Sequence, residues 1–207
     1  MYFNMAALDQ KRCYKLLAST VVPRPIAWVV TSDDQGVVNA APFSFFNFFS
    51  GFPPVVCIGI GHRDGKPKDS LVNIRSTGEF VVNLVSEDLA EAMSITAGDF
   101  PPGVNELEKA ELKILSSMQI DLPRIALSPV SIECKLSQVI AVDTTAVIVI
   151  AHVIGMHIRD DAVIDAERCY IDTSKLKIIG RMENPDWYTR TNERFNIRPT
   201  KFDHDEK

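Results

Sequence analysis

The sequence predicts a mainly β protein, an antiparallel barrel with short helices around it. The two longest strand candidates, residues 130–140 and 146–158, are separated only by the turn-forming run Asp143-Thr144-Thr145. Many of the other strand candidates also lack an intervening helix, which argues against a doubly wound parallel sheet. Over 207 residues, 46% hydrophobic and 24% charged content is typical of a globular chain and excludes a largely disordered one.

The strand candidates are runs of β-branched and other apolar residues that end at prolines, glycines or turn residues. Pro23 and Pro25 forbid a helix before the first of them. The turn over residues 33–36 separates the first candidate from the second, so we expect these two to form a hairpin. In chain order, the strands are expected at residues 26–31, from 37 onward, 55–60, 79–85, 130–140, 146–158 and 162–165.

Short helices are expected between some of these strands. They are predicted over residues 9–18 after the N-cap Asp9, from the cap Asp69 to 76, over 87–95 after the cap Ser86, and as a single turn at 106–110. Gly78 supplies the stop for the second helix. In the first helix, Leu16 and Leu17 are placed to face a core.

Charge and composition exclude several classes of function. Acidic residues outnumber basic ones by 27 to 22, for a net charge of -5, whereas a protein that neutralises nucleic-acid phosphates needs the opposite sign. The most apolar run, residues 146–156, is too short to span a membrane, and the first residues do not resemble a signal peptide. The four cysteines lack the close spacing of a zinc site. We therefore expect a cytoplasmic protein with no nucleic-acid, membrane or metal site.

Phenylalanine is concentrated in one segment, because six of the eleven phenylalanines lie between Phe43 and Phe52. Such rings suit a core or a subunit interface, which is the favoured interpretation for most of them. However, Ser44, Asn47 and Ser50 lie among the rings. A planar heteroaromatic ligand needs apolar faces and a few hydrogen-bonding edges, so this segment is also a candidate ring site.

A basic loop precedes the second predicted helix. Arg63, Lys66 and Lys68, together with Ser70, lie just before or at its start. Because a helix start offers free N–H groups and the positive end of the helix dipole, a phosphate would be favoured there. A solvated loop is an equally good interpretation, and Asp69 argues against an anion unless it only caps the helix. A ring site and a phosphate site joined by one strand are what flavin mononucleotide (FMN) requires.

Four runs of the sequence resemble the flavin reductase-like, FMN-binding split-barrel family in residues, order and approximate spacing. They are residues 23–31 (PRPIAWVVT), 39–47 (NAAPFSFFN), 68–74 (KDSLVNI) and 78–83 (GEFVVN). The resemblance is strong over residues 20–95 and continues more weakly as far as residue 181.

The resemblance implies a homodimer of antiparallel split β-barrels with FMN near the subunit interface. The segment 44–47 would contact the flavin ring and ribityl chain, the residues around Lys68 would lie near the phosphate, and Thr31 and Gly61 would line the same cleft. The implied cofactor-binding residues are Thr31, Ser44, Phe45, Phe46, Asn47, Gly61, Arg63, Lys68, Asp69 and Ser70.

The resemblance also implies an FMN-dependent oxidoreductase of the flavin reductase type, which transfers a hydride or electrons between NAD(P)H and flavin. Its partners would be NAD(P)H and a free flavin or an electron-acceptor protein. Two alternatives stay open: an FMN-containing electron carrier without a nicotinamide substrate, and a structural protein that keeps the barrel without the cofactor. Because the cofactor performs the chemistry in such enzymes, no residue is nominated as a catalytic acid or base.

We expect a single domain over residues 1–207, with a polar tail from about residue 183. The tail carries four aromatic residues, Trp187, Tyr188, Phe195 and Phe202, whereas a disordered tail is expected to be poor in them. A helix over residues 186–195 would place Arg190 and Arg194 on one face. Such a helix either only caps the barrel or forms an arm beside the flavin cleft that limits which acceptors enter.

Overall fold

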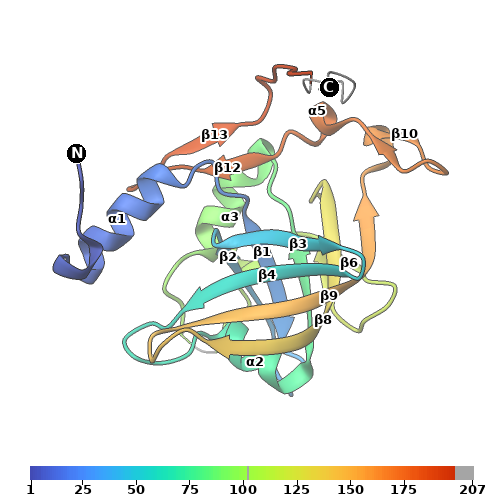
Figure 1. Ribbon diagram of the computed structural model, residues 1–207. Helices are drawn as coiled ribbons and strands as arrows, with labels where there is room; N and C mark the ends of the chain where they lie inside the picture. Colours follow the sequence, from blue (N-terminus) through green and yellow to red (C-terminus); the bar gives the residue numbers. More distant parts are fainter. Residues whose placement is uncertain (102, 199–207) are drawn as a thin grey trace, which may run out of the picture.

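A seven-stranded sheet forms the centre of the computed structural model, which describes residues 1–101 and 103–198 (Figure 1). The strand order is β2-β1-β5-β8-β9-β4-β3, and every neighbouring pair is antiparallel. The strands are β1 (Ala27–Ser32), β2 (Val38–Phe43), β3 (Phe46–Gly51), β4 (Pro54–Gly61), β5 (Glu79–Asn83), β8 (Val130–Ala141) and β9 (Ala146–Ile158). The sheet curves on itself, so that Val29 and Phe80 from one half share a buried core with Ile58 and Val149 from the other. The predicted antiparallel, mainly β fold is confirmed.

The barrel is split between its two end strands, β2 and β3, which follow each other in the chain but occupy opposite ends of the strand order. The segment that joins them passes against β4, where the Gly59 N–H donates to the Phe45 carbonyl oxygen at 2.7 Å. A Cβ atom at position 59 would lie 3.0 Å from the Cβ of Phe45, so a larger residue would require the two segments to move apart by a few tenths of an ångström.

The predicted strands are confirmed with shifts of at most two residues at their ends. The predicted turns are also present. The Asp33 carboxylate accepts hydrogen bonds from the N–H groups of Gln35 and Val37, and the Asp143 carboxylate accepts them from Thr145 and Ala146. By contrast, β3 was not predicted, because most of its residues are exposed and its phenylalanines do not alternate with polar residues.

Three two-stranded sheets accompany the barrel. They are β6 (Ile114–Ser116) with β7 (Pro123–Ile125), β10 (Val163–Asp165) with β11 (Tyr170–Ile171), and β12 (Ile179–Arg181) with β13 (Tyr188–Arg190). The helix considered over residues 186–195 is therefore not formed. The backbone of β13 is used by its ladder with β12, and the Arg190 guanidinium forms an ion pair with Glu87, which together hold this part of the tail extended. Phe202 lies outside the described residues.

The helices are short. They are α1 (Gln10–Thr20), α2 (Asp69–Thr77), α3 (Ala90–Thr96), α4 (Glu106–Lys109) and α5 (Thr173–Leu176), with single 3-10 turns at Met5–Ala7, Glu87–Leu89 and Asp160–Ala162. As predicted, Asp9 caps α1 by accepting a hydrogen bond from the Arg12 N–H at 2.8 Å, and Gly78 ends α2 with a φ of +73°. Within the described part of the chain, no helix is long and apolar enough to cross a membrane.

Three predicted details of the helices are wrong. Helical geometry begins at Asp69, so the N-cap of α2 is Lys68, which makes no side-chain capping bond. Ser86 also makes no capping bond and precedes a 3-10 turn before α3 begins. Leu17 is 53% exposed, and Leu16 is only half-buried, because α1 projects away from the barrel instead of packing on it (Figure 1).

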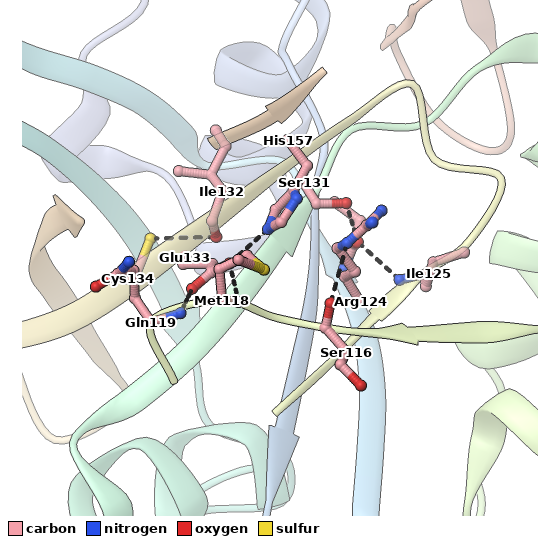
Figure 2. A network of polar contacts seen from close by, with 11 residues as sticks. Ser116, Met118, Gln119, Arg124, Ile125, Ser131, Ile132, Glu133, Cys134 and His157 are labelled. Carbon is pink, nitrogen blue, oxygen red and sulfur yellow. Dashed lines mark hydrogen bonds and ion pairs between the residues drawn. The ribbon is translucent and has the colours of Figure 1, made fainter. Parts of the chain in front are cut away.

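A fully buried carboxylate on β8 fastens the loop between β6 and β7 to the barrel (Figure 2). Glu133 accepts hydrogen bonds from the N–H groups of Met118 and Gln119, at 2.8 and 2.7 Å, and its Oε1 lies 2.5 Å from His157 Nε2. Burial alone would raise the pKa of Glu133, but these hydrogen bonds outweigh burial and hold the pKa below its usual value. The ionised carboxylate is therefore the form that the fold requires.

Replacing this carboxylate should destabilise the protein. Glu133→Gln replaces one carboxylate oxygen with an NH₂ group, which cannot accept the hydrogen bond from the Met118 or Gln119 N–H. The free energy of unfolding should fall by about 3 kcal/mol. Glu79→Gln is the matched control. It removes a carboxylate that lies 3.5 Å from the Lys135 ammonium on the surface, and about 1 kcal/mol or less should be lost. Urea denaturation measures both changes.

The pH dependence provides a second readout of the same variant. A carboxyl group whose pKa is lowered by folding stabilises the fold above its unfolded pKa, about 4.3 for glutamate, and this stabilisation is lost as the pH falls through the folded value. The difference between wild type and Glu133→Gln should therefore shrink in acid. A difference that stays constant from neutral to acidic pH would contradict the assigned role of Glu133.

Candidate functional site

A cavity of about 470 Å³ opens beside the start of α2, between β2 and the segment that follows α3. Its lining is rich in charged and polar groups, and we call it the cationic cavity after its three basic residues, which lie there beside four acidic ones: Asn39, Arg63, Asp64, Lys66, Lys68, Asp69, Ser70, Asp99 and Glu106. The structure thus brings together four residues that the sequence predicted as a phosphate site, and it adds two carboxylates and an amide from elsewhere in the chain.

The floor of the cationic cavity is a buried hydrogen-bond network centred on Asn39. The Asn39 Oδ1 accepts hydrogen bonds from the hydroxyls of Ser70, at 2.8 Å, and Thr31, at 3.4 Å, while its Nδ2 donates to Glu106 Oε1 at 2.7 Å. Asn73 Nδ2 in turn donates to the Thr31 hydroxyl at 3.1 Å. Each member is at least nine-tenths buried, so the floor is a fixed part of the barrel.

Glu106 is a member of this site that the sequence did not reveal. Its second oxygen, Oε2, accepts a hydrogen bond from the Ala40 N–H at 2.9 Å, so the carboxylate fastens both the side chain and the backbone of β2. The only signal in the sequence was the predicted helical turn at 106–110, which is α4. Its partners lie 66 and 67 residues earlier in the chain, beyond the reach of any local pattern.

The rim of the cationic cavity carries the basic side chains of Arg63, Lys66 and Lys68 beside the acidic Asp64, Asp69 and Asp99. Lys68 is half-buried, with its ammonium 5.3 Å from the centre of the Phe43 ring. Burial lowers the pKa of Lys68, the nearby charge of Arg63 lowers it further, and Asp99 opposes the shift. Arg63 itself forms an ion pair with Asp99. No side chain caps α2, so the N–H groups of Asp69 and Ser70, which line the cavity, have no side-chain capping acceptor.

The predicted ring-binding residues are divided between other places. Phe45, Phe46, Asn47 and Gly61 line a separate and mostly apolar concave surface of about 470 Å³, between β3, β4 and β9. Ser44 lines a smaller hollow of about 170 Å³, which we call the tail hollow because Tyr188 of the tail forms one side of it with Arg181, its partner in the β12–β13 ladder. Thr31 has no exposed surface and lies beneath the floor of the cationic cavity. The assignment of these residues to a cofactor stays a prediction.

The tail hollow lies next to the cationic cavity, and Pro42 and Ala97 line both. Together their linings follow β2 from Asn39, near its start, to Ser44, just after its end. Ser44 accepts a hydrogen bond from Arg24 Nε at 3.3 Å, which fixes its position at the end of this path. The combined space joins a charged end at α2 to a partly apolar end at the tail.

Residues 18–174 match the family described as "Flavin reductase like domain". The chain belongs to this family. Among its relatives, an uncharacterized protein of Deinococcus radiodurans is 42% identical over 95% of this chain and 88% of its own length. The uncharacterized protein YwrF of Bacillus subtilis is 39% identical over 96% of this chain and 98% of its own length. The sequence-based resemblance to flavin reductases is therefore confirmed.

Solved structures agree with this assignment. The 2-nitrobenzoate 2-nitroreductase NbaA of Pseudomonas fluorescens superposes with a TM-score of 0.89 and 33% identity, covering 98% of each chain. Nitrilotriacetate monooxygenase component B of Bacillus cereus also gives 0.89, with 30% identity over 95% of this chain and 98% of that one. A protein of Shewanella frigidimarina that is described as a flavin reductase with a split-barrel domain shares the fold, with a TM-score of 0.82 and 19% identity over 97% of this chain and 100% of that one. The family and its neighbours make this protein a flavin-related oxidoreductase.

Proposed function

We propose that this protein binds FMN and transfers electrons from NADH or NADPH through it to an acceptor. The observation that carries the proposal is the cationic cavity, which places three basic side chains and an uncapped helix start at one end of a path along β2. That arrangement suits a phosphate at one end and a planar ring farther along. The solved neighbour with 33% identity is named for the reduction of 2-nitrobenzoate, which favours an organic acceptor.

The residues of the cationic cavity fit a phosphate monoester. Among the described residues, no carboxylate lies within ion-pair distance of the half-buried Lys68 ammonium. A phosphate would supply the missing negative charge and would accept hydrogen bonds from the first turn of α2. Arg63, now paired with the exposed Asp99, can turn one face of its guanidinium to the same phosphate.

The chain contributes position and electrostatics rather than acid–base chemistry. Bound FMN would supply the redox centre, accepting a hydride from the nicotinamide and passing electrons on. The hydrogen bonds of Asn39 anchor β2 to α2 and α4. They therefore fix β2, along which the flavin would lie, relative to Arg63 and Lys68. Ser44, held by Arg24, can donate its hydroxyl proton to a ring oxygen or nitrogen.

The absorption spectrum of the purified protein tests the proposal directly. Protein supplied with FMN and then desalted should keep a yellow flavin spectrum, which NADH or NADPH should bleach without air. If an electron-donor protein alone bleaches it, the protein is an electron carrier without a nicotinamide substrate. Protein that takes up no FMN would overturn the proposal and favour a structural barrel.

The phosphate contact is tested by Lys68→Ala. A charged hydrogen bond contributes roughly 1.5–3 kcal/mol, so FMN binding should weaken about tenfold or more. Riboflavin, which lacks the phosphate, should bind wild type and variant equally weakly. Arg75→Ala, at the other end of the same helix, is the matched control and should change neither ligand. Equal FMN dissociation constants for wild type and Lys68→Ala, measured by flavin fluorescence, would remove Lys68 from the site.

We also propose that two copies of the chain associate through the aromatic surface of β3. Phe48, Phe49 and Phe52 are 72%, 68% and 96% exposed, and the apolar concave surface between β3, β4 and β9 lies beside them. Apolar surface of this kind on a water-exposed face is typical of a protein interface. The exposed Leu17 on the projecting helix α1 adds to the apolar surface that the single chain leaves open.

Light scattering at micromolar concentration tests the association. Wild type should have the mass of a homodimer. The double variant Phe48→Ser/Phe49→Ser should shift toward the monomer mass, because it removes two exposed rings without touching the core. Met118→Ser is the control, since Met118 is 79% exposed but lies in the loop between β6 and β7. A monomer mass for wild type would contradict the proposal.

A further inference from the structure

Two guanidinium groups are gathered at the tail hollow. Arg181 lines the hollow directly, and among the described residues the lining includes no carboxylate. Arg24 lies behind Ser44, because its Nε donates to the Ser44 hydroxyl at 3.3 Å. Burial lowers the pKa of Arg24, Tyr14 opposes this shift, and the charge of Arg181 adds to it, so the two cations lie close enough to repel each other. Positive charge is therefore concentrated where the path along β2 ends.

Arg24 is a buried cation without an ionic partner in the described part of the chain. The residue is only 5% exposed. Apart from the bond to Ser44, its hydrogen bonds go to the carbonyl oxygens of Ala18, Val21 and Met182. These neutral oxygens satisfy its N–H groups but do not neutralise its charge. Because arginine keeps its proton in proteins and water is distant, this charge is permanent and weakly screened.

The tail holds Arg181 in place beside the hollow. Its guanidinium carbon lies 4.7 Å from the centre of the Tyr188 ring, and its Nη2 donates to Asn184 and to the Pro185 carbonyl oxygen. Asp186 lies 3.6 Å from the same Nη2, but its side chain is 85% exposed, so water screens it and it offsets the charge only in part. Within the described ranges, Nε and Nη1 of Arg181 have no hydrogen-bond acceptor, so both are available to a ligand.

Ser44 connects these cations to the place proposed for the flavin ring. Because its oxygen accepts the hydrogen bond from Arg24 Nε, its own proton is directed away from Arg24 and is polarised by the cation. Of the two ends of a flavin ring system, the pyrimidine end carries carbonyl oxygens, whereas the other end is a dimethyl-substituted benzene ring. Only the pyrimidine end can accept hydrogen bonds from Ser44 and Arg181, so this end fits the tail hollow.

We propose that Arg24 and Arg181 raise the redox potential of bound FMN, and that Ser44 transmits part of their effect. The inference rests on the proposed function. A hydride from NADH or NADPH carries two electrons and one proton, so the nicotinamide leaves with one more positive charge and the flavin ring gains one negative charge, mainly at its pyrimidine end. Arg24 and Arg181 stabilise the ring more after it has gained this charge than before, which raises the potential. Both act by position and charge, and neither transfers a proton.

The midpoint potential of the FMN-loaded protein, measured at neutral pH against a reference dye, tests the proposal. A charged hydrogen bond contributes about one decade or more to a binding ratio, and one decade corresponds to about 30 mV for two electrons. Arg181→Gln should therefore lower the potential by about 30 mV or more, whereas Arg181→Lys keeps the charge and should restore most of it. Arg168→Gln is the matched control, because the Arg168 guanidinium carbon also lies over a tyrosine ring, 4.5 Å from the centre of Tyr170, in the turn between β10 and β11. It should leave the potential unchanged.

Variants of Arg24 and Ser44 separate charge from structure. Arg24→Gln and Arg24→Lys both disturb the contacts with α1 and the tail, but only Arg24→Gln removes the charge, so it alone should lower the potential. Ser44→Ala keeps Arg24 and should lower the potential by a smaller amount. Potentials equal to that of wild type in both Arg181→Gln and Ser44→Ala, with FMN bound, would overturn this proposal and leave FMN binding intact. Protein that takes up no FMN would overturn the proposed function as well.

Discussion

The buried side chain of Asn39 is the contact on which the geometry of the site depends. Its oxygen accepts a hydrogen bond from Ser70 on α2, and its nitrogen donates to Glu106 on α4, so one amide joins β2 to two helices. The same oxygen is reached by Thr31 from β1. Because the donor and acceptor ends of an amide are fixed in direction, the network admits one arrangement of these segments. The cationic cavity therefore has a floor as rigid as the barrel core beneath it.

Charge is distributed very unevenly over this acidic chain. The net charge is -5, yet Arg63 and Lys68 lie at one end of the path along β2, and Arg24 and Arg181 lie at the other. A local potential depends on where charges are placed and how well water screens them, so the net charge says little about it. The basic side chains at the α2 end are the groups that a flavin phosphate would require there.

The split in the barrel determines which surfaces remain available. At one side of the split, β3 has a ladder on one edge only and turns Phe48 and Phe49 outward. At the other side, the guanidinium of Arg24 joins the end of α1 to the tail through the carbonyls of Ala18 and Met182. Arg24 also donates to Ser44, so the N-terminal helix and the C-terminal part of the chain meet beside the end of β2. An open barrel consequently provides an apolar face for assembly and a mixed hollow for a ligand.

The sequence by itself determined the antiparallel strands, their turns and the family, because a turn such as that at Asp33 depends on residues only a few positions apart. It also located the basic loop, whose residues are neighbours in the chain. Only the tertiary structure decided that Glu106 supports the cationic cavity and that the tail is extended, with Arg181 beside Ser44. Arg24 and Met182 are hydrogen-bonded across 158 positions, and such contacts arise from the way the sheet curves and closes, which no local pattern of residues records.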